Sequence, residues 1–535
     1  MNSGNANARE VPRSTGSGSA AAAFVLACAV LALAGCGGGG GGGGASGGGF
    51  PIIAPPSVAP PAASGGDDDA ILASSTVAGL CAAPRTGIDP ETGAAYPDKP
   101  GTLTQEKRWV RGWIDETYLW FGEVPATLKA ADYATPVAYF SVLKTPALTA
   151  SGRAKDRFHY VYDTERFRQL SQNGVAPGYG MEFAFLRNSR PRDLRIAFTE
   201  PGSPAAAAGI GRGAKVLEVD GVDVIDGTNT TVINRGISPT AVGESHTFKL
   251  QEGGATRTVT LAAANVTRTP VQNVKSIDTA SGRVGYLLFN DHITTSETQL
   301  IAAFNQFRQD GVQDLVLDMR YNGGGQLNIA SRLAAMVSSS GATSGKTFER
   351  LAFNDKNPFH LTAAQTVIPF YGTSRTGATL PRLALSQVTV LVGPDTCSAS
   401  ESVVNSLRGI DVKVNLVGGA TCGKPYGFFP QDNCGTSYFA IQFQGVNAKG
   451  FGDYGDGFAP DCAVADDFDH ALGDPSEARL AAALAMRGGG ACPASASAKS
   501  LPGLEKSGTA GEQPYLLDRT PLREMRLFDA APAPG

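Results

Sequence analysis

The largest part of the chain alternates short apolar runs with amphipathic segments. An apolar run such as Val388-Thr-Val-Leu-Val392 is typical of a buried strand, and the stretch after it places apolar residues at helical spacing. The expected strands are 284–289, 315–319, 388–392 and 412–417, and the expected helices are 295–309, 326–337 and 401–408. This alternation predicts an α/β layered core over residues 271–490.

The region before the core shows helical spacing first. Between about residues 101 and 172, Trp109, Trp113 and Tyr118 recur near helical spacing. Such a pattern is more often a buried face than a binding surface. We therefore expect a helical region over 84–173.

Short β-type runs dominate residues 174–270. Ser203 and Pro204 are good residues to begin a helix, and Gly209 is a good residue to end it. The pair Asp220-Gly221 then predicts a tight hairpin turn inside an alternating run. This unit resembles the PDZ domains of bacterial proteases.

That resemblance assigns a peptide-binding role to one loop. Residues Gly178, Tyr179, Gly180 and Met181 fall where PDZ domains hold their carboxylate-binding loop. Backbone N–H groups there would hold a C-terminal carboxylate while the peptide adds to the sheet edge as a strand. The alternative is a small β-domain without a ligand.

The N-terminus has the pattern of an export signal. Arg9 and Arg13 precede a small and apolar run that ends in Leu33-Ala-Gly-Cys36, which resembles a bacterial lipobox. The expectation is a signal peptide over 1–35, a lipid-modified Cys36 and a periplasmic protein anchored to a bacterial membrane, with the outer membrane as one possibility. A plain secretory signal is the alternative. Residues 36–83 are Gly/Pro-rich and predict a flexible tether.

Composition narrows the class of partner. The net charge of −4 gives no basic surface for nucleic acid, and no later stretch is apolar enough for a membrane helix. Residues 491–535 predict a poorly packed tail.

Six cysteines remain outside the signal and the lipobox, which favours disulfides in an oxidising compartment. Their pairing is open, and a Cys422–Cys434 bridge closing a hairpin is the one we expect.

Three segments of the core carry chemistry. They are Leu317-Asp-Met-Arg-Tyr-Asn-Gly-Gly-Gly325, Thr396-Cys-Ser-Ala-Ser-Glu401 and Thr421-Cys-Gly-Lys-Pro-Tyr426, and Gly457-Phe-Ala-Pro-Asp461 and a helical segment from Asp474 follow them. In this order they resemble the tail-specific, or C-terminal processing, serine proteases, which are S41-type peptidases. The resemblance implies a core of the crotonase/ClpP-like type with an inserted or preceding PDZ-like domain, no cofactor and no metal.

Carried over residue by residue, the resemblance assigns a catalytic dyad. Ser398 would be the nucleophile and Lys424 the general base. A serine hydroxyl needs a base to take its proton, and a lysine can do so only when burial disfavours its charged form. The resemblance and the helix that begins near Glu401 place the oxyanion hole at the backbone N–H groups of Ala399 and of a glycine, Gly324 or Gly325. Asp318, Arg320 and Glu401 would support the site.

Alternatives to this assignment stay open. Ser400 could be the reactive serine, His292 could be the base, and Asp318 with Arg320 could form a purely structural ion pair. Family members often carry a glutamine one turn after the lysine, where this chain has Phe428. The separation between serine and lysine is also slightly longer than usual, which we attribute to the loop from Gly409.

The sequence thus predicts a periplasmic serine endopeptidase with protein or peptide substrates. A PDZ-like domain would bind exposed C-termini or unfolded segments, and Ser398 would form an acyl-enzyme. The alternative is a catalytically silent lipoprotein that binds peptides or another ligand on the same fold.

Overall fold

The structure is a computed structural model, and it describes residues 70–90, 92–487, 490–493, 515–516 and 526–527. All of them belong to one compact unit, residues 65–535. The expected signal peptide, Cys36 and most of the tether lie outside the described residues, as does most of the tail. No helix within the described ranges has both the length and the apolar composition needed to cross a membrane.

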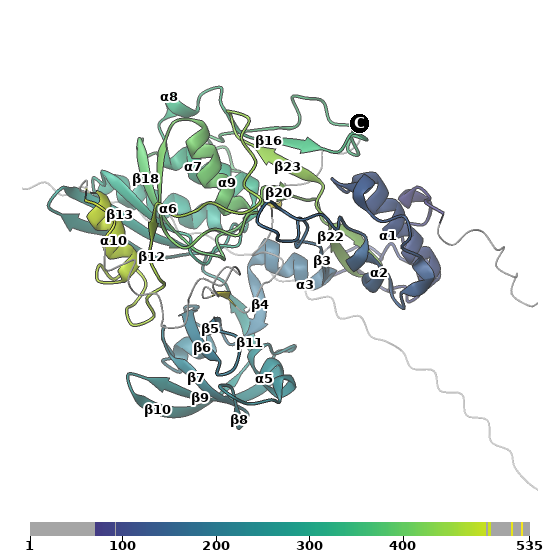
Figure 1. The fold of residues 1–535 in the computed structure, drawn as a ribbon, viewed down its shortest axis with the longest axis horizontal. Helices are drawn as coiled ribbons and strands as arrows, with labels where there is room; N and C mark the ends of the chain where they lie inside the picture. Colours follow the sequence, from purple (N-terminus) through teal and green to yellow (C-terminus); the bar gives the residue numbers. More distant parts are fainter. Residues whose placement is uncertain (1–69, 91, 488–489, 494–514, 517–525, 528–535) are drawn as a thin grey trace, which may run out of the picture. The chain divides into compact units, whose positions relative to one another are not determined.

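A parallel sheet forms the core. Its order is β12 (Val271–Thr279), β13 (Gly282–Phe289), β14 (Asp314–Asp318), β18 (Gln387–Val392), β19 (Lys413–Gly418) and β24 (Cys462–Ala463). Only the edge strand β12 runs antiparallel to its neighbour. The chief helices are α6 (Ser296–Gln309), α7 (Leu327–Val337), α9 (Ala399–Gly409) and α10 (Ala478–Arg487), as Figure 1 shows. All seven elements expected for the core are present, with ends that differ by one or two residues.

Apolar side chains on both faces of this sheet are buried. Leu315 and Leu317 of β14 pack in the cluster that includes α6, α7 and α9, whereas Val316 packs with Leu480 of α10. Successive side chains of a strand point to opposite faces, so a strand covered on both sides is apolar throughout. This explains the unbroken apolar run in the sequence.

A second sheet forms the β-rich region. Its order is β10 (Ala255–Ala262), β9 (Ser245–Glu252), β7 (Lys215–Val219), β6 (Asp193–Thr199) and β5 (Met181–Arg187), with β8 (Val222–Asp223) beside β7 and two helices, α4 (Pro204–Ala207) and α5 (Thr230–Ile237). The local predictions are confirmed: Ser203 Oγ accepts from the N–H of Ala206 at 3.2 Å. Asp220 and Gly221 both have positive φ, 49° and 76°, in the turn between β7 and β8.

The described part of residues 84–173, the region expected to be helical, has three separate α-helices that cover only part of it. It contains α1 (Leu103–Thr117), α2 (Pro136–Val142) and α3 (Thr164–Arg168), joined by turns. Its aromatic face is buried, with Trp109 stacked on Trp113 at 5.6 Å between ring centroids. Tyr438 of the core packs against both tryptophans. It lies on β22 (Thr436–Phe439), between β21 (Gln431–Asn433) and β3 (Tyr160–Asp163).

The other elements are short. They are η1 (Ser74–Thr76), β1 (Leu80–Cys81), β2 (Lys99–Pro100), η2 (Phe121–Glu123), η3 (Ala130–Asp132), η4 (Gln169–Asn173), β4 (Val175–Gly178), β11 (Ala264–Thr267), β15 (Gly325–Gln326), α8 (Ser340–Thr343), β16 (Thr347–Phe353), β17 (Val367–Pro369), β20 (Tyr426–Gly427) and β23 (Phe443–Val446). Two strands come from the tail: β25 (Tyr515–Leu516) pairs antiparallel with β5, and β26 (Arg526–Leu527) pairs parallel with β15.

The expected Cys422–Cys434 bridge is wrong. The structure joins Cys81 to Cys434, Cys397 to Cys422 and Cys462 to Cys492. Cys434 does lie in the turn of the β21–β22 hairpin, but this turn lies against the N-terminal segment, where Gly79 N–H donates to Asn433 Oδ1 at 2.9 Å. Cys434 therefore lies closer in space to Cys81, 353 positions away, than its place in the sequence suggested.

Candidate active site

The predicted nucleophile stands between a strand and a helix. Ser398 follows β18 and is the residue before α9, with φ of 58° and ψ of −115°. Few residues other than glycine adopt such a positive φ, and they do so mostly where surrounding contacts hold them. Ser398 is fully buried, and its Oγ makes no hydrogen bond to the residues that the structure describes.

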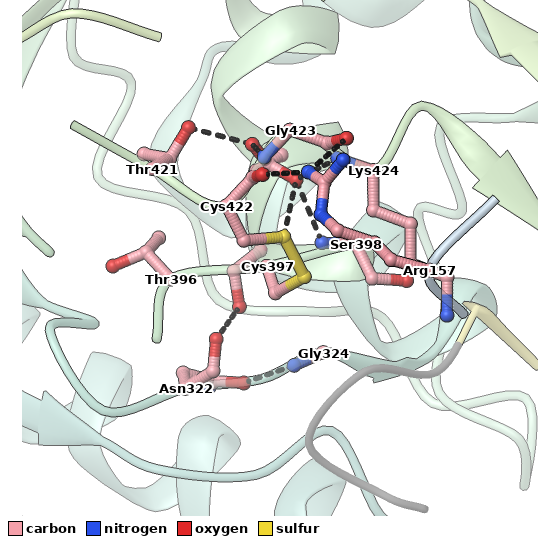
Figure 2. Close-up of a disulfide and its surroundings, with 12 residues drawn as sticks. Arg157, Asn322, Gly324, Thr396, Cys397, Ser398, Thr421, Cys422, Gly423 and Lys424 are labelled. Carbon is pink, nitrogen blue, oxygen red and sulfur yellow. Dashed lines mark hydrogen bonds between the residues drawn. A yellow bond between two sulfur atoms is a disulfide. The ribbon is translucent and has the colours of Figure 1, made fainter. Parts of the chain in front are cut away.

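The predicted base lies in the segment after the next strand, β19. Lys424 is fully buried. Its Nζ lies 4.3 Å from the ring centroid of Phe428 and 4.8 Å from that of Phe158. Figure 2 shows Lys424 and Ser398 in one close-up, beside the Cys397–Cys422 disulfide. Phe428 thus occupies the position of the expected glutamine and contributes a wall of the lysine pocket.

One carboxylate connects the two segments. Glu401 in the first turn of α9 accepts from the backbone N–H of Ser398 at 3.0 Å. It also accepts from the N–H groups of Gly423 and Lys424, both at 2.8 Å, and from Thr421 Oγ1 at 2.6 Å. Burial raises the pKa of the Glu401 carboxyl above its ordinary value, and these hydrogen bonds oppose the rise. Glu401 therefore fixes the backbone of the serine and of the lysine to one point.

Arg157 is a contributor that the sequence interpretation missed. Its Nη2 donates to the carbonyl oxygens of Cys422 and, at 3.3 Å, of Gly423. Arg157 therefore binds carbonyl groups of the lysine segment (residues 421–424), whose N–H groups Glu401 binds, and its neighbour Phe158 contacts the lysine. Arg157 lies in the helical region, more than 260 positions before the segment it binds. No local motif marks it.

Asn322 fixes the glycine segment, residues 322–325, through its backbone and its side chain. The carbonyl oxygen of Asn322 accepts from Cys397 N–H at 3.1 Å and from Ser400 Oγ at 2.9 Å, so the glycine segment and the serine segment are in contact. Its Oδ1 accepts from Gly324 N–H at 3.0 Å. In this conformation the Gly324 N–H is therefore already used. The oxyanion-hole assignment to Ala399, Gly324 and Gly325 stays a prediction.

Both rival catalytic residues have structural partners. Ser400 donates to the Asn322 carbonyl, as described above. His292 is fully buried, its Nδ1 lies 3.0 Å from Asn322 Oδ1, and burial lowers its pKa to about 4. Its backbone bonds to Gly324 and Gln326 at 3.0 and 2.8 Å. These contacts fit a residue that supports the glycine segment.

Asp318 and Arg320 belong to a buried ionic network beside the site. Arg320 pairs with Asp318 at 2.9 Å and with Asp466 and Glu477 at 2.7 Å each. These carboxylates raise the pKa of Arg320 well above its ordinary value, against the effect of burial. Arg212 of the β-rich region also binds Asp466, at 2.7 Å. The network joins the core, the segment before α10 and the β-rich region. The supporting role of Asp318 and Arg320 in catalysis stays a prediction.

The predicted carboxylate loop connects β4 to β5. Gly180 has φ of 77°, and a Cβ there would lie 2.2 Å from Ser203 Cβ, so the loop requires glycine at this position. A cavity of about 310 Å³ adjoins the loop. Its lining includes Gly178, Tyr179, Gly180 and Met181 together with Arg166 and Arg268. Arg268 is already paired with Asp291 at 3.1 Å.

One group of potential metal ligands occurs among the described residues. Ligand atoms of Cys397, Glu401 and Cys422 lie within 4.8 Å of one another. The two sulfurs are bonded to each other, so neither can act as a thiolate ligand while the disulfide is intact.

The core sheet thus carries a buried serine and a buried lysine in the segments that follow two neighbouring parallel strands, β18 and β19. In a comparison with known proteins, residues 283–461 match the sequence model of peptidase family S41. A putative S41 protease from Bacteroides fragilis has the same mixed α/β fold, with a TM-score of 0.57 at 23% identity over 74% of this chain and 99% of that one.

Two relatives of this chain are named as C-terminal processing enzymes. A carboxyl-terminal-processing protease of Picosynechococcus sp. is 28% identical over 343 residues, which cover 62% of this chain and 75% of the relative. A chloroplastic C-terminal processing peptidase of Tetradesmus obliquus is 28% identical over 270 residues, 47% of this chain and 52% of the relative. These similarities support a serine protease that acts on proteins or peptides.

Proposed function

We propose that the protein is a serine endopeptidase that uses a Ser398–Lys424 dyad. The observation that carries this proposal is the shared anchoring by Glu401, which binds the backbone N–H groups of Ser398 and Lys424 at 3.0 and 2.8 Å. A nucleophile and a base must stay in register through several steps of a reaction, and a buried carboxylate between their segments provides that register.

The proposed reaction proceeds through an acyl-enzyme. Lys424, in its neutral form, accepts the proton of Ser398 Oγ as this oxygen attacks the peptide carbonyl. The lysine then gives the proton to the leaving amine, and water hydrolyses the ester with Lys424 again as base. The N-terminus of α9 offers the Ala399 N–H to the developing oxyanion, and the second donor comes from the glycine segment.

We further propose that the β-rich region is a PDZ-like module that captures C-termini. Its strand β5 already accepts an added strand, β25, through antiparallel pairing of Tyr515 with Phe185 and Leu516 with Ala184. Peptides bind PDZ domains by the same kind of strand addition. Arg166 in the cavity wall supplies positive charge for a terminal carboxylate.

The proposed location is the periplasm, with a lipid anchor at Cys36. Three disulfides support an oxidising compartment. Mass spectrometry of the membrane-extracted protein tests the anchor, since acylation of an N-terminal Cys36 would add the mass of its acyl chains, and a Cys36→Ala substitution would release the protein.

Activity is tested by proteolysis of an unfolded protein with residues 65–535, the compact unit. We compare wild type with Ser398→Ala, Lys424→Ala and His292→Ala. Complete loss in the first two supports the dyad when the third keeps measurable activity; a partial loss in His292→Ala is expected because His292 supports the glycine segment. A wild type that binds peptides and cleaves none would support the silent, ligand-binding alternative, and an active Lys424→Ala variant would assign the base elsewhere.

A further inference from the structure

A disulfide bond joins the segment that carries Ser398 to the segment that carries Lys424. Cys397 immediately precedes Ser398, and Cys422 lies two residues before Lys424. Their disulfide brings the two Cα atoms to 5.1 Å, so it ties the turn after β18 to the turn after β19 (Figure 2). The other two disulfides lie elsewhere, at the N-terminal segment and beside α10.

The serine needs such a tie because its backbone is held in an unfavourable conformation. Few residues adopt the φ and ψ of Ser398, and those that do keep this conformation only where their surroundings impose it. Two groups adjacent to Ser398 act in this way: the Glu401 carboxylate, which accepts from its N–H, and the Cys397 side chain, which is bonded to the lysine segment.

The lysine segment depends on the same tie. Lys424 Nζ is flanked by the rings of Phe158 and Phe428, at 4.8 and 4.3 Å from their centroids. The backbone that carries this side chain is the segment from Thr421 to Lys424. That backbone is fixed by Glu401, by Arg157 and by the disulfide.

We propose that the Cys397–Cys422 disulfide is a redox site that positions the dyad: the oxidised form is active, and reduction by a dithiol switches it off. The proposal rests on the proposed Ser–Lys peptidase function. Cys397 is buried with 2% exposure whereas residue Cys422 is partly exposed, so the proposed attack comes from the side of Cys422.

The chemistry is thiol–disulfide exchange. One thiolate of the dithiol attacks Cys422 Sγ, which forms a mixed disulfide and releases the Cys397 thiolate. The second thiol of the reductant then displaces Cys422, so the dithiol is oxidised to a disulfide while Cys397 and Cys422 gain two electrons and two protons. Reoxidation restores the bond and the active geometry.

The experiment measures peptidase activity of the full chain in dithiothreitol buffers of graded potential. Differential alkylation and mass spectrometry report which of the three disulfides is reduced in each buffer. We expect kcat to fall about 100-fold, with little change in KM, as Cys397 and Cys422 become reduced, because small displacements of catalytic groups have effects of this size.

Three double variants separate this bond from the others. Cys397→Ala with Cys422→Ala should show the same loss of kcat and no further response to dithiothreitol. Cys81→Ser with Cys434→Ser and Cys462→Ser with Cys492→Ser are the matched controls. They should keep both the activity and its response to the reductant.

Hydrogen exchange provides a readout that does not need activity. Reduction should speed hydrogen exchange of the amides of Ser398, Gly423 and Lys424. In the variant with Cys81→Ser and Cys434→Ser, which has no bond at this place to reduce, exchange in the segment around position 81 should be the same before and after reduction. Unchanged exchange and unchanged kcat after reduction of Cys397 and Cys422 would overturn the proposal. A wild type that is inactive in every buffer would instead refute the peptidase function, and the exchange data would still decide whether the disulfide positions these segments.

Discussion

At the scale of single residues, Glu401 has the contacts that matter most in the candidate site. Its two oxygens accept from three backbone N–H groups and one hydroxyl, and it is fully buried. A carboxylate has lone pairs for all of these donors, whereas an amide has one acceptor oxygen and adds donors of its own. Glutamine would therefore fit the space and lose part of the bonding.

We predict that Glu401→Gln lowers kcat about 100-fold through misplacement of Ser398 and Lys424. The free energy of unfolding should fall by about 1–3 kcal/mol, because buried donors lose their acceptor. Peptidase assays and urea unfolding measure the two effects. The control is Glu477→Gln, a buried carboxylate of the Arg320 network, which should cost stability while the folded fraction keeps near-normal kcat. Equal kcat losses in both variants would contradict the assigned role.

At the scale of elements, the candidate site lies where strands end. The segments of Ser398 and Lys424 follow β18 and β19, which are parallel neighbours, and the glycine segment follows β14, the next strand along. Carboxyl ends of parallel strands meet at one edge of a sheet, which is where such folds hold their ligands. The short strand β15 extends the glycine segment, and it lies against His292 through backbone bonds.

We predict that Gly325→Ala abolishes most activity and destabilises the protein by more than the backbone cost alone. Gly325 has φ of 129°, and a Cβ there would lie 2.4 Å from the carbonyl oxygen of His292, which is backbone and cannot move aside cheaply. Gly202→Ala is the matched control, because Gly202 also has a positive φ, 71°, but has nothing within 4 Å of the added Cβ. Thermal unfolding and peptidase assays of both variants test this; similar effects in the two would contradict it.

At the scale of the whole molecule, buried ionisable side chains connect the β-rich region to the core. Arg212 binds Asp466 of the core network, and Glu200 accepts from the backbone N–H of Thr269 and from Gln272 Nε2 at 3.0 and 3.1 Å. Burial raises the pKa of Glu200 to about 7. The carboxyl is therefore protonated in the native protein over a pH range where it is ionised in the unfolded chain.

The Glu200 pKa predicts a pH dependence of stability. Between the ordinary value of 4.5 and about 7, the native state binds more protons than the unfolded state, so the unfolding free energy falls as pH rises through this window. Over the whole window, the raised pKa of Glu200 lowers the free energy of unfolding by about 3 kcal/mol. Glu200→Gln should remove this slope, and Glu252→Gln, at a partly exposed carboxylate paired with Arg257, should not. Urea unfolding at pH 5 and pH 8 measures it, and parallel pH profiles of wild type and Glu200→Gln would contradict the prediction.

The tail predicts a second whole-molecule effect. Because β25 pairs along β5, a peptide that adds at the same edge must displace it. Deletion of residues 494–535 should therefore tighten binding of a labelled peptide with a free C-terminus, measured by fluorescence anisotropy. Leu516→Pro, which removes one backbone donor of β25, should tighten it as well, and Ala530→Pro, outside both tail strands, is the control. Equal affinity in all four proteins would show that the tail does not compete for this edge.

The sequence by itself was sufficient for the core elements and for the two segments, after β18 and β19, that carry Ser398 and Lys424. The catalytic roles of these two residues stay a prediction. Strands such as 388–392 are buried on both faces and therefore apolar along their whole length, and helix starts such as Ser203 have a local chemical cause. The serine and lysine segments carry their own motifs. These features depend on neighbours a few positions away, so they can be predicted from the order of residues alone.

Only the tertiary structure decided the cysteine pairing, the role of Arg157 and the partners of Asp318 and Arg320. Each depends on which distant segments meet: Cys81 and Cys434 are 353 positions apart, and Arg157 binds the carbonyl oxygen of a residue 265 positions away. Sequence patterns report the period and burial of one segment, and they carry no information on which segment packs against it. The disulfide between the serine and lysine segments became visible only when β18 and β19 were placed side by side.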